Sequence, residues 1–178
     1  MAVGDPPLHR FTTEDVIRMA EVGLLHPEAR VELLDGVLVD LSPPGPMHGG
    51  VVSWLNRHFV IGLPDLEVRV QDTLLVEGGF VLPDLIVCDA VDRTRLPDGA
   101  HLVVEVSVTT RAHDRSKRVR YARAGVTELW IVDPERRRVT VHRGPGADGY
   151  ADIVDHTDGA TIQALVGAPP VDVSALLG

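Results

Sequence analysis

The sequence predicts a mixed α/β or α+β domain built around one central sheet. Three observations lead to this fold class. The expected elements follow in the order helix, hairpin, helix, several strands, helix and strands, which suits a sheet covered by helices. The 178 residues match the length of one domain and are enough to bury a core. No repeat or low-complexity linker divides them, so we expect a loose arm over residues 1–10 and a single domain over residues 11–178.

The first half of the chain is predicted to contain a helix, a hairpin and a second helix. Thr12 or Thr13 can cap a helix over about residues 14–23. The dipeptide Asp35-Gly36, between two short apolar runs, is a strong signal for a β-hairpin turn. The breaker cluster SPPGP precedes a second helix over about residues 47–62. Its apolar side chains recur at near-helical spacing, at Val51, Val52, Leu55 and Phe59.

The second half is predicted to alternate strands with one helix. Residues 66–77 have the pattern of one bent strand or two short ones, and further strands are expected at about 84–89 and 101–107. The charged segment 111–124 is expected to be a helix. The runs ELWIVD and RRVTVHR then form a second hairpin-like pair, and short strand-like pieces follow from residue 144.

Composition and charge restrict the class of protein. Hydrophobic residues make up 44% of the chain and charged residues 24%, as in ordinary soluble globular proteins. The net charge of -9 argues against coating of nucleic acid by the whole surface, although a local basic patch is compatible with it. The single cysteine, Cys88, excludes an intrachain disulfide and is expected in the core. Because the chain has neither a signal-peptide pattern nor an apolar run of about 20 residues, we expect a soluble, cytoplasmic protein that does not contact membranes.

Two predicted strands each carry a carboxylate. Asp84 begins one of them in VLPDLIVCDA, and Glu105 lies late in the other, HLVVEVSVTT. A buried carboxylate is costly unless something pairs with it. If the strands are neighbours, both side chains can point into one cavity, and a carboxylate pair with water is a typical Mg²⁺ site. The alternatives are a turn aspartate after Pro83 and a glutamate on a solvent-facing edge.

The helix that follows supplies a cation. At about 100° per residue, Asp114, Lys117 and Tyr121 fall on one face, so Lys117 can reach back over the strand ends. A lysine there can orient a metal-bound water or balance the charge of a phosphate. The helix carries six of the 17 Lys and Arg residues, which suits contact with a phosphate backbone. The alternative is an ordinary solvated face. The six are Arg111, Arg115, Lys117, Arg118, Arg120 and Arg123.

Several of these motifs together resemble the Uma-two endonuclease family of the PD-(D/E)XK nuclease superfamily. They are ELLDG with a downstream SP…H at 32–48, LPD at 82–84, LVVEVS at 102–107, and DRSKRVRYARAGVTELWIVDP at 114–134. The resemblance covers about residues 10–145. It implies a restriction-endonuclease-like core, in which helices flank a central mixed sheet. It also implies hydrolysis of phosphodiester bonds with Mg²⁺, or with Mn²⁺ as a substitute.

The resemblance also assigns metal ligands and a catalytic lysine. By position, Asp84 and Glu105 would be ligands, Glu32 would complete the acidic set, and the backbone carbonyl of Val106 would also face the metal. The superfamily lysine normally lies two residues after the glutamate, where this chain has Ser107. The resemblance therefore transfers its role to Lys117 in the following helix.

Other positions remain open. Arg115 and Arg118 would flank a groove for DNA, and Gln71 with Asp72 would line the cleft unless they are simply polar strand-surface residues. His48 could contact the substrate or cap its helix. Asp114 is expected to pair with Lys117 or an arginine, and Tyr121 and Trp130 are expected in the core. His101 and His113 have no metal-ligand spacing.

The sequence thus favours a metal-dependent endonuclease acting on DNA. A homodimer is expected, because two basic helices along one groove would offset the acidic charge. Two other classes stay open: a catalytically silent nucleic-acid-binding or interaction module on the same fold, and a metal-dependent phosphohydrolase of small phosphate esters. The complete set Glu32, Asp84, Glu105 and Lys117 favours an enzyme over the silent module.

Overall fold

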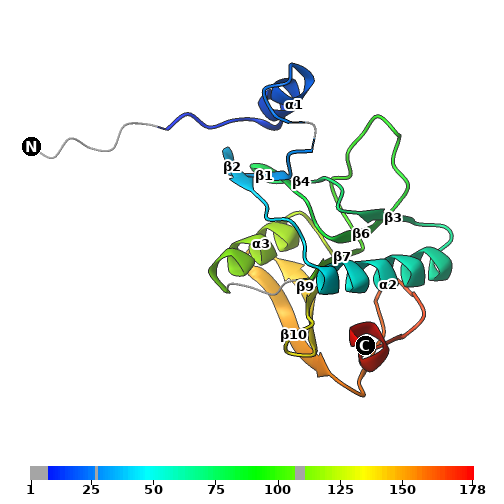
Figure 1. The fold of residues 1–178 in the computed structure, drawn as a ribbon. Helices are drawn as coiled ribbons and strands as arrows, with labels where there is room; N and C mark the ends of the chain where they lie inside the picture. Colours follow the sequence, from blue (N-terminus) through cyan, green and yellow to red (C-terminus); the bar gives the residue numbers. More distant parts are fainter. Residues whose placement is uncertain (1–7, 27, 107–110) are drawn as a thin grey trace, which may run out of the picture.

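The computed structural model describes residues 8–26, 28–106 and 111–178, without the side chains of residues 111–116 (Figure 1). The helices are α1 (Thr13–Glu21), α2 (Pro46–Gly62), α3 (Arg111–Arg123) and α4 (Val173–Leu177). The strands are β1 (Val31–Leu34), β2 (Val37–Asp40), β3 (Glu67–Val70), β4 (Leu74–Val76), β5 (Gly79–Val81), β6 (Leu85–Cys88), β7 (Leu102–Val106), β8 (Glu128–Asp133), β9 (Arg138–Gly146), β10 (Gly149–Thr157), β11 (Thr161–Ile162) and β12 (Val171–Asp172).

The larger sheet confirms the predicted fold class. Its six strands have the order β10-β9-β8-β7-β6-β3. Within the described strands, β7 and β8 form the one parallel pair, and α3 makes the crossover between them. The other neighbours in this sheet run antiparallel, so the sheet is mixed. The short strands β11 and β12 pair separately.

A second sheet, which the sequence did not predict, has the order β2-β1-β5-β4. The hairpin turn expected between β1 and β2 is confirmed, with φ of 50° at Asp35 and 75° at Gly36. The strand β5 then pairs with β1 through Leu33 and Phe80. At Gly79, which has φ 153°, a Cβ would lie 2.0 Å from the carbonyl oxygen of Leu33. Only glycine therefore allows β1 and β5 to approach so closely.

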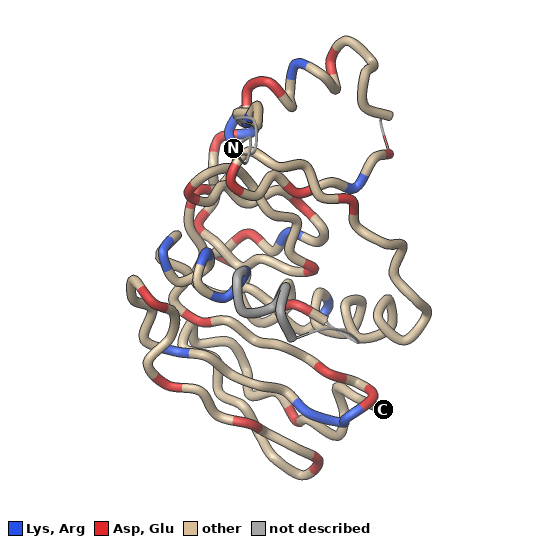
Figure 2. The backbone as a smooth tube through the Cα atoms, turned by 90° about the vertical axis from the view of Figure 1, so that its left-hand side faces the viewer, with Lys and Arg blue, Asp and Glu red and all other residues tan. Residues whose placement is uncertain are grey.

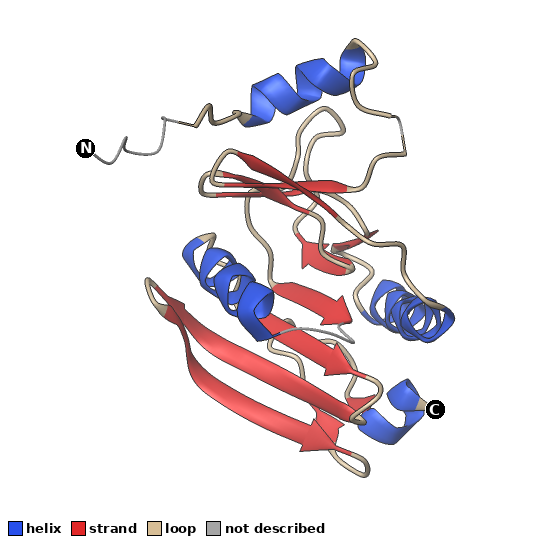
Figure 3. Cartoon of the chain, turned by 60° about the vertical axis from the view of Figure 1, so that its left-hand side comes forward, coloured by secondary structure: helices blue, strands red, loops and turns tan. Residues whose placement is uncertain are grey.

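Alternate residues of β6 and β7 pack against helices on opposite sides of the larger sheet (Figure 3). The row that packs with α2 consists of Leu85, Val87, Leu102 and Val104. On the other side, Ile86 and Val103 pack with Tyr121 of α3. Because every second strand residue shares a face, Asp84 and Glu105 extend this second row. Both carboxylates are thereby directed to the side of the sheet that α3 covers.

The buried carboxylate of Glu128 attaches the chain segment after β10 to the larger sheet through hydrogen bonds. Its Oε1 accepts hydrogen bonds from Arg143 Nε at 2.9 Å, Arg143 Nη2 at 2.7 Å and Trp130 Nε1 at 3.0 Å. Its Oε2 accepts the backbone N–H of Leu165 at 2.6 Å. Arg143 Nη2 also donates to the carbonyl of Gln163 at 2.6 Å. A single side chain thus joins β8, β9 and the chain after β10.

Most element boundaries agree with the sequence prediction to within two residues. The helix α1 is shorter than expected, and Thr12 rather than Thr13 caps it, in a reciprocal capping box with Asp15. The stretch 66–77 forms two strands in different sheets. Of the predicted N-terminal arm, residues 1–7 lie outside the described part, whereas Arg10 donates to the carbonyl of Asp35 at 2.9 Å. Among the described residues, no helix is long and apolar enough to cross a membrane.

The turn after β8 gives a pH-dependent prediction. Asp133 accepts hydrogen bonds from Arg136 N at 3.0 Å and Arg136 Nη1 at 2.7 Å. Burial alone would raise the pKa of Asp133, but these bonds outweigh it and lower the pKa below its ordinary value. The ionised carboxylate therefore stabilises the fold above the pKa of the unfolded state, and this stabilisation is lost as the pH falls through the lower pKa of the folded state.

We expect Asp133→Asn to lower the free energy of unfolding at pH 7 by about 1 kcal/mol or less, because the Arg136 side chain is largely exposed to solvent. The difference from the unmodified chain should shrink in acid. Urea unfolding at pH 7 and at pH 3 measures both values. A difference that stayed constant between these pH values would contradict the assignment.

Candidate active site

The two sheets meet where four chain segments bring charged side chains together. Glu32 comes from β1 in the smaller sheet, and Glu105 from β7 in the larger one. Asp84 directly precedes β6, and Lys117 lies in the second turn of α3. Glu32 is fully buried, and the side chains of Glu105 and Lys117 are only 14% and 13% exposed. Four predicted site residues are therefore gathered at one partly enclosed place.

Lys117 lies between the two glutamates. Its Nζ is 2.9 Å from Glu32 Oε1 and 2.8 Å from Glu105 Oε1. The backbone N–H of Leu82 also donates to Glu32 Oε1, at 3.1 Å. Burial alone would lower the pKa of Lys117, but the charges of Glu105 and Glu32 outweigh it and raise the pKa above its ordinary value. Lys117 is therefore an ammonium ion at neutral pH, able to donate hydrogen bonds and balance negative charge but unable to accept a proton.

Asp84 has a different environment. Its Oδ2 accepts the backbone N–H of Val106 at 2.8 Å, and its Oδ1 lies 2.8 Å from His48 Nε2. Burial, followed by the negative charge of Glu105, raises the pKa of Asp84, and the contacts with Val106 and His48 only partly oppose this rise. A buried carboxylate whose charge is disfavoured by a neighbouring carboxylate is typical of a functional site, where a cation would relieve the repulsion.

Tyr121 holds the second carboxylate of this pair. Its hydroxyl donates a short hydrogen bond to Glu105 Oε1, and its ring is completely buried. Burial and then the charge of Glu105 raise the pKa of Tyr121 well above its ordinary value, so it stays protonated. We expected Tyr121 only in the core. Its place one helical turn after Lys117, on the same face, was the signal for this second role.

A comparison with protein families gives the class to which the chain belongs. The model of the Uma2 family, described as "Putative restriction endonuclease", matches residues 13–172, which is most of the chain. The chain belongs to the Uma2 family. The resemblance seen in the sequence motifs is thus confirmed. No curated protein matches the sequence.

A solved structure shares this Uma2 fold. It is a protein from Anabaena variabilis, described as a putative nuclease belonging to DUF820. The TM-score is 0.79, and the match covers 94% of this chain and 97% of the other one. Because only 12% of the aligned residues are identical, this likeness concerns the fold alone.

The acidic set of this Uma2 chain fits a hard divalent cation in its donor chemistry. Asp84, Glu105 and Glu32 offer carboxylate oxygens, the ligands that Mg²⁺ prefers. Glu32 Oε2 is buried and has no hydrogen-bond partner among the described residues. In the described part of the chain, however, no three His, Cys, Asp or Glu side chains already surround one point. Lys117 and His48 hold the carboxylates instead. The predicted role of the Val106 carbonyl stays a prediction, while its N–H orients Asp84.

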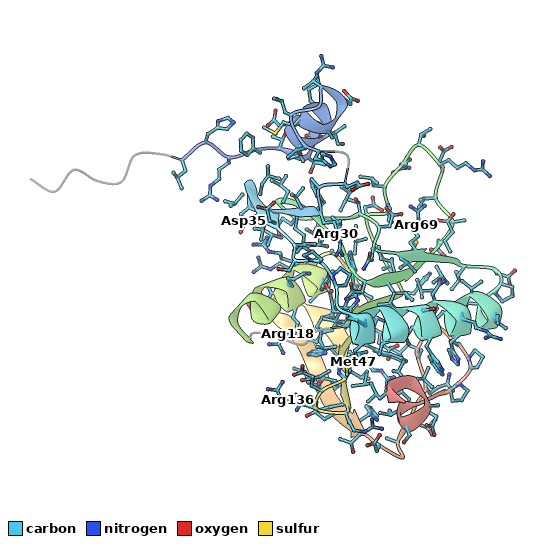
Figure 4. All side chains as sticks on the ribbon, viewed as in Figure 1. Arg30, Asp35, Met47, Arg69, Arg118 and Arg136 are labelled. Atoms are coloured by element: carbon cyan, nitrogen blue, oxygen red, sulfur yellow. The ribbon has the colours of Figure 1, made fainter. Side chains whose placement is uncertain are left out.

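His48 lies in the first turn of α2, beside Met47, which marks the start of this helix in Figure 4. Its side chain contacts Asp84, and α2, whose N-cap residue is Gly45, has no side-chain cap. The capping alternative for His48 is therefore wrong. Gln71, predicted to contact the substrate, approaches Asp84 through its backbone, since its N–H donates to the Asp84 carbonyl at 3.1 Å. Its φ of 50° is unusual for a residue other than glycine.

Several of the basic side chains predicted on the surface of α3 contact other parts of the protein. Arg120 binds Asp35 of the β1–β2 turn through two hydrogen bonds, of 2.9 and 2.5 Å, which lower the pKa of Asp35. Arg123 donates to the carbonyl of Ala147 at 2.8 Å. Arg118 Nη1 lies 3.5 Å from Nε2 of the buried His142. These contacts attach α3 to both sheets.

The remaining residues considered in the sequence have different outcomes. The side chains of Arg111, His113, Asp114 and Arg115 lie outside the described residues, as does Ser107. Asp72 binds Arg69 at 2.8 Å, and His101 pairs with Asp89 at 3.0 Å near the surface. Acidic residues outnumber basic ones in this chain. They are spread along the backbone rather than gathered in one segment (Figure 2).

Proposed function

We propose that this chain is a metal-dependent endonuclease that hydrolyses phosphodiester bonds of DNA. The observation that carries this proposal is the meeting of Lys117 with Glu32 and Glu105, next to Asp84, from four separate segments. Membership of a family described as restriction endonucleases supports the reaction class. The metal, the DNA substrate and the dimer are further parts of the proposal.

In this mechanism Asp84, Glu105 and Glu32 would hold Mg²⁺, with Mn²⁺ as a substitute. The bound ion would lower the pKa of a water ligand and screen the charge that develops on the phosphate. Lys117 remains protonated, and its ammonium orients the attacking water or stabilises the negatively charged transition state. The N–H of Val106 and the hydroxyl of Tyr121 keep the two carboxylates in place. The chain thus contributes the charge of Lys117 and carboxylates that are held in one orientation.

DNA is proposed as the substrate because phosphodiester chemistry needs cations beside the site, and α3 supplies them. Arg115 and Arg118, on either side of Lys117 in the sequence, are proposed to contact the DNA backbone, Arg118 in addition to its approach to His142. A homodimer that aligns two copies of α3 would compensate for the net charge of -9. Sedimentation velocity tests the dimer separately from the activity. We also propose that the protein is cytoplasmic.

Incubation of the purified protein with several substrates tests this function. Supercoiled plasmid, a single-stranded oligonucleotide and bis(p-nitrophenyl) phosphate are each combined with increasing Mg²⁺ or Mn²⁺, and with EDTA as the control. We expect the plasmid to be nicked or linearised only when a metal is present. Hydrolysis of the small ester alone would favour the phosphohydrolase alternative. Binding of DNA without any cleavage would favour the silent module.

Tyr121→Phe tests how Glu105 is held. The change keeps the buried ring and removes the hydroxyl, so we expect Mg²⁺ affinity to fall about 10-fold because a group that orients a ligand contributes this much. The free energy of unfolding should change by only about 1 kcal/mol. Isothermal titration calorimetry and thermal unfolding measure the two quantities.

The matched control for this change is Tyr150→Phe, because the Tyr150 hydroxyl donates to the carbonyl of Val126 at 2.9 Å. This variant should lose similar stability and keep its metal affinity. Equal Mg²⁺ affinity in Tyr121→Phe and in the unmodified chain would contradict a positioning role for Tyr121.

A further inference from the structure

His48 contributes the one nitrogen donor described within hydrogen-bond distance of Asp84 Oδ1. Its Nε2 lies 2.8 Å from that oxygen, and its side chain is only 11% exposed. Asp84 Oδ2 accepts the N–H of Val106 and Oδ1 faces His48, so a cation bound at Oδ1 would lie beside the imidazole. The first turn of α2 thus directs an imidazole at the oxygen that the proposed metal would use.

The separation of these two atoms suits a shared ion as well as a hydrogen bond. Neighbouring ligands of an octahedral ion, each about 2.1 Å from it, lie about 3 Å apart. The other ring nitrogen of His48, Nδ1, is buried and has no hydrogen-bond partner among the described residues. The tautomer of His48 is therefore not fixed by a second contact, and Nε2 can carry either a proton or a lone pair.

A second, independent observation points to a cation in the charged cluster that Lys117 joins. The carboxylate of Glu32 is fully buried, and its Oε2 lacks a partner within the described part of the chain. A buried carboxylate oxygen without a partner is costly, and a bound cation would remove that cost. Glu32 approaches from the smaller sheet and His48 from α2, so the proposed ligands come from different elements.

We propose that His48 Nε2 is a ligand of the same divalent ion, so that the site prefers a first-row transition metal such as Mn²⁺ to Mg²⁺. This inference rests on the proposed metal-dependent function. Imidazole nitrogen is a good ligand for transition ions, whereas Mg²⁺ is bound mainly through carboxylate oxygens and water. His48 thereby determines which metal is selected, while the carboxylates provide the charge.

Calorimetric titration of the full chain with Mn²⁺ and with Mg²⁺, in the absence of DNA, tests the inference. The informative variant is His48→Gln, because its side-chain amide can still donate to Asp84 but has no imidazole nitrogen. We expect the ratio of Mn²⁺ to Mg²⁺ affinity to fall at least about 10-fold in this variant. The matched control, His58→Gln, lies in the same helix, where His58 contacts the carbonyl of Pro169, and it should leave the ratio unchanged.

Pulsed electron paramagnetic resonance of bound Mn²⁺ gives a second readout that does not depend on activity. Coupling to a ¹⁴N nucleus should be present in the unmodified chain and absent in His48→Gln. Mn²⁺ binding without ¹⁴N coupling, or an unchanged affinity ratio in His48→Gln, would overturn the role of His48 and leave the proposed function intact. If neither ion bound the unmodified chain, both proposals would be overturned.

Discussion

Asp84→Asn is expected to lower the rate of metal-dependent DNA cleavage by about 10² to 10⁴-fold, which corresponds to about 3–5 kcal/mol of transition-state stabilisation. The amide has nearly the shape of the carboxylate and can still accept the N–H of Val106. It removes the negative charge that would bind the cation. Plasmid nicking at saturating Mg²⁺, followed as an initial rate, measures the loss.

The same variant should fold at least as well as the unmodified chain in metal-free buffer. Burial and the charge of Glu105 already disfavour the ionised form of Asp84, so the neutral amide relieves an unfavourable interaction. Loss of activity with an unchanged or higher melting temperature would separate a functional from a structural role. Asp89→Asn, at the exposed position that follows β6, is the matched control for both measurements. Cleavage by Asp84→Asn at the unmodified rate would remove Asp84 from the site.

Glu128→Ala is expected to have the largest effect on stability. The change removes the acceptor for Trp130, Arg143 and the N–H of Leu165. Trp130 is fully buried and loses its partner, whereas Arg143 keeps its bond to the carbonyl of Gln163. The loss of several hydrogen bonds to one buried carboxylate typically costs about 3–5 kcal/mol. For a chain of this size that corresponds to a decrease of about 6–20 °C in melting temperature. Differential scanning calorimetry measures it.

Glu135→Ala is the matched control for this prediction. Glu135 is exposed in the turn after β8, and its replacement should change stability by no more than about 0.5 kcal/mol. The folded fraction of Glu128→Ala at low temperature should cleave DNA normally, because Glu128 belongs to a cluster separate from Lys117 and its carboxylates. A decrease of less than about 2 °C in the Glu128 variant would show that the C-terminal segment is held by its apolar contacts alone.

The sequence allowed prediction of the features that depend on local patterns. The β1–β2 turn was evident because Asp35-Gly36 suits two positive φ angles. The helix that carries Lys117 was evident from its spacing and from Gly125 beyond it. The carboxylates Asp84 and Glu105 attracted notice because charge within an apolar strand is costly. The alternative of a solvent-facing edge for Glu105 is wrong, since β7 lies inside the larger sheet.

Features that depend on contacts between residues far apart in the sequence could not be predicted from local patterns. Nothing near Leu33 or Phe80 in the sequence indicates that these residues pair, so the second sheet was missed. Glu128 was missed because a glutamate at the start of a strand usually faces solvent, and its partners outside β8 come from two later segments. The arginines of α3 were interpreted as one surface, since their acceptors are turns that only the folded chain brings near.

The pairing of Lys117 with Glu32 has a consequence for synthesis of the protein. Glu32 leaves the ribosome early, but it meets its cation only after β5, β7 and α3 have all emerged and docked. A nascent or truncated polypeptide that ends before α3 would lack the complete charged set. The proposed hydrolytic activity is therefore expected only from chains that extend through α3.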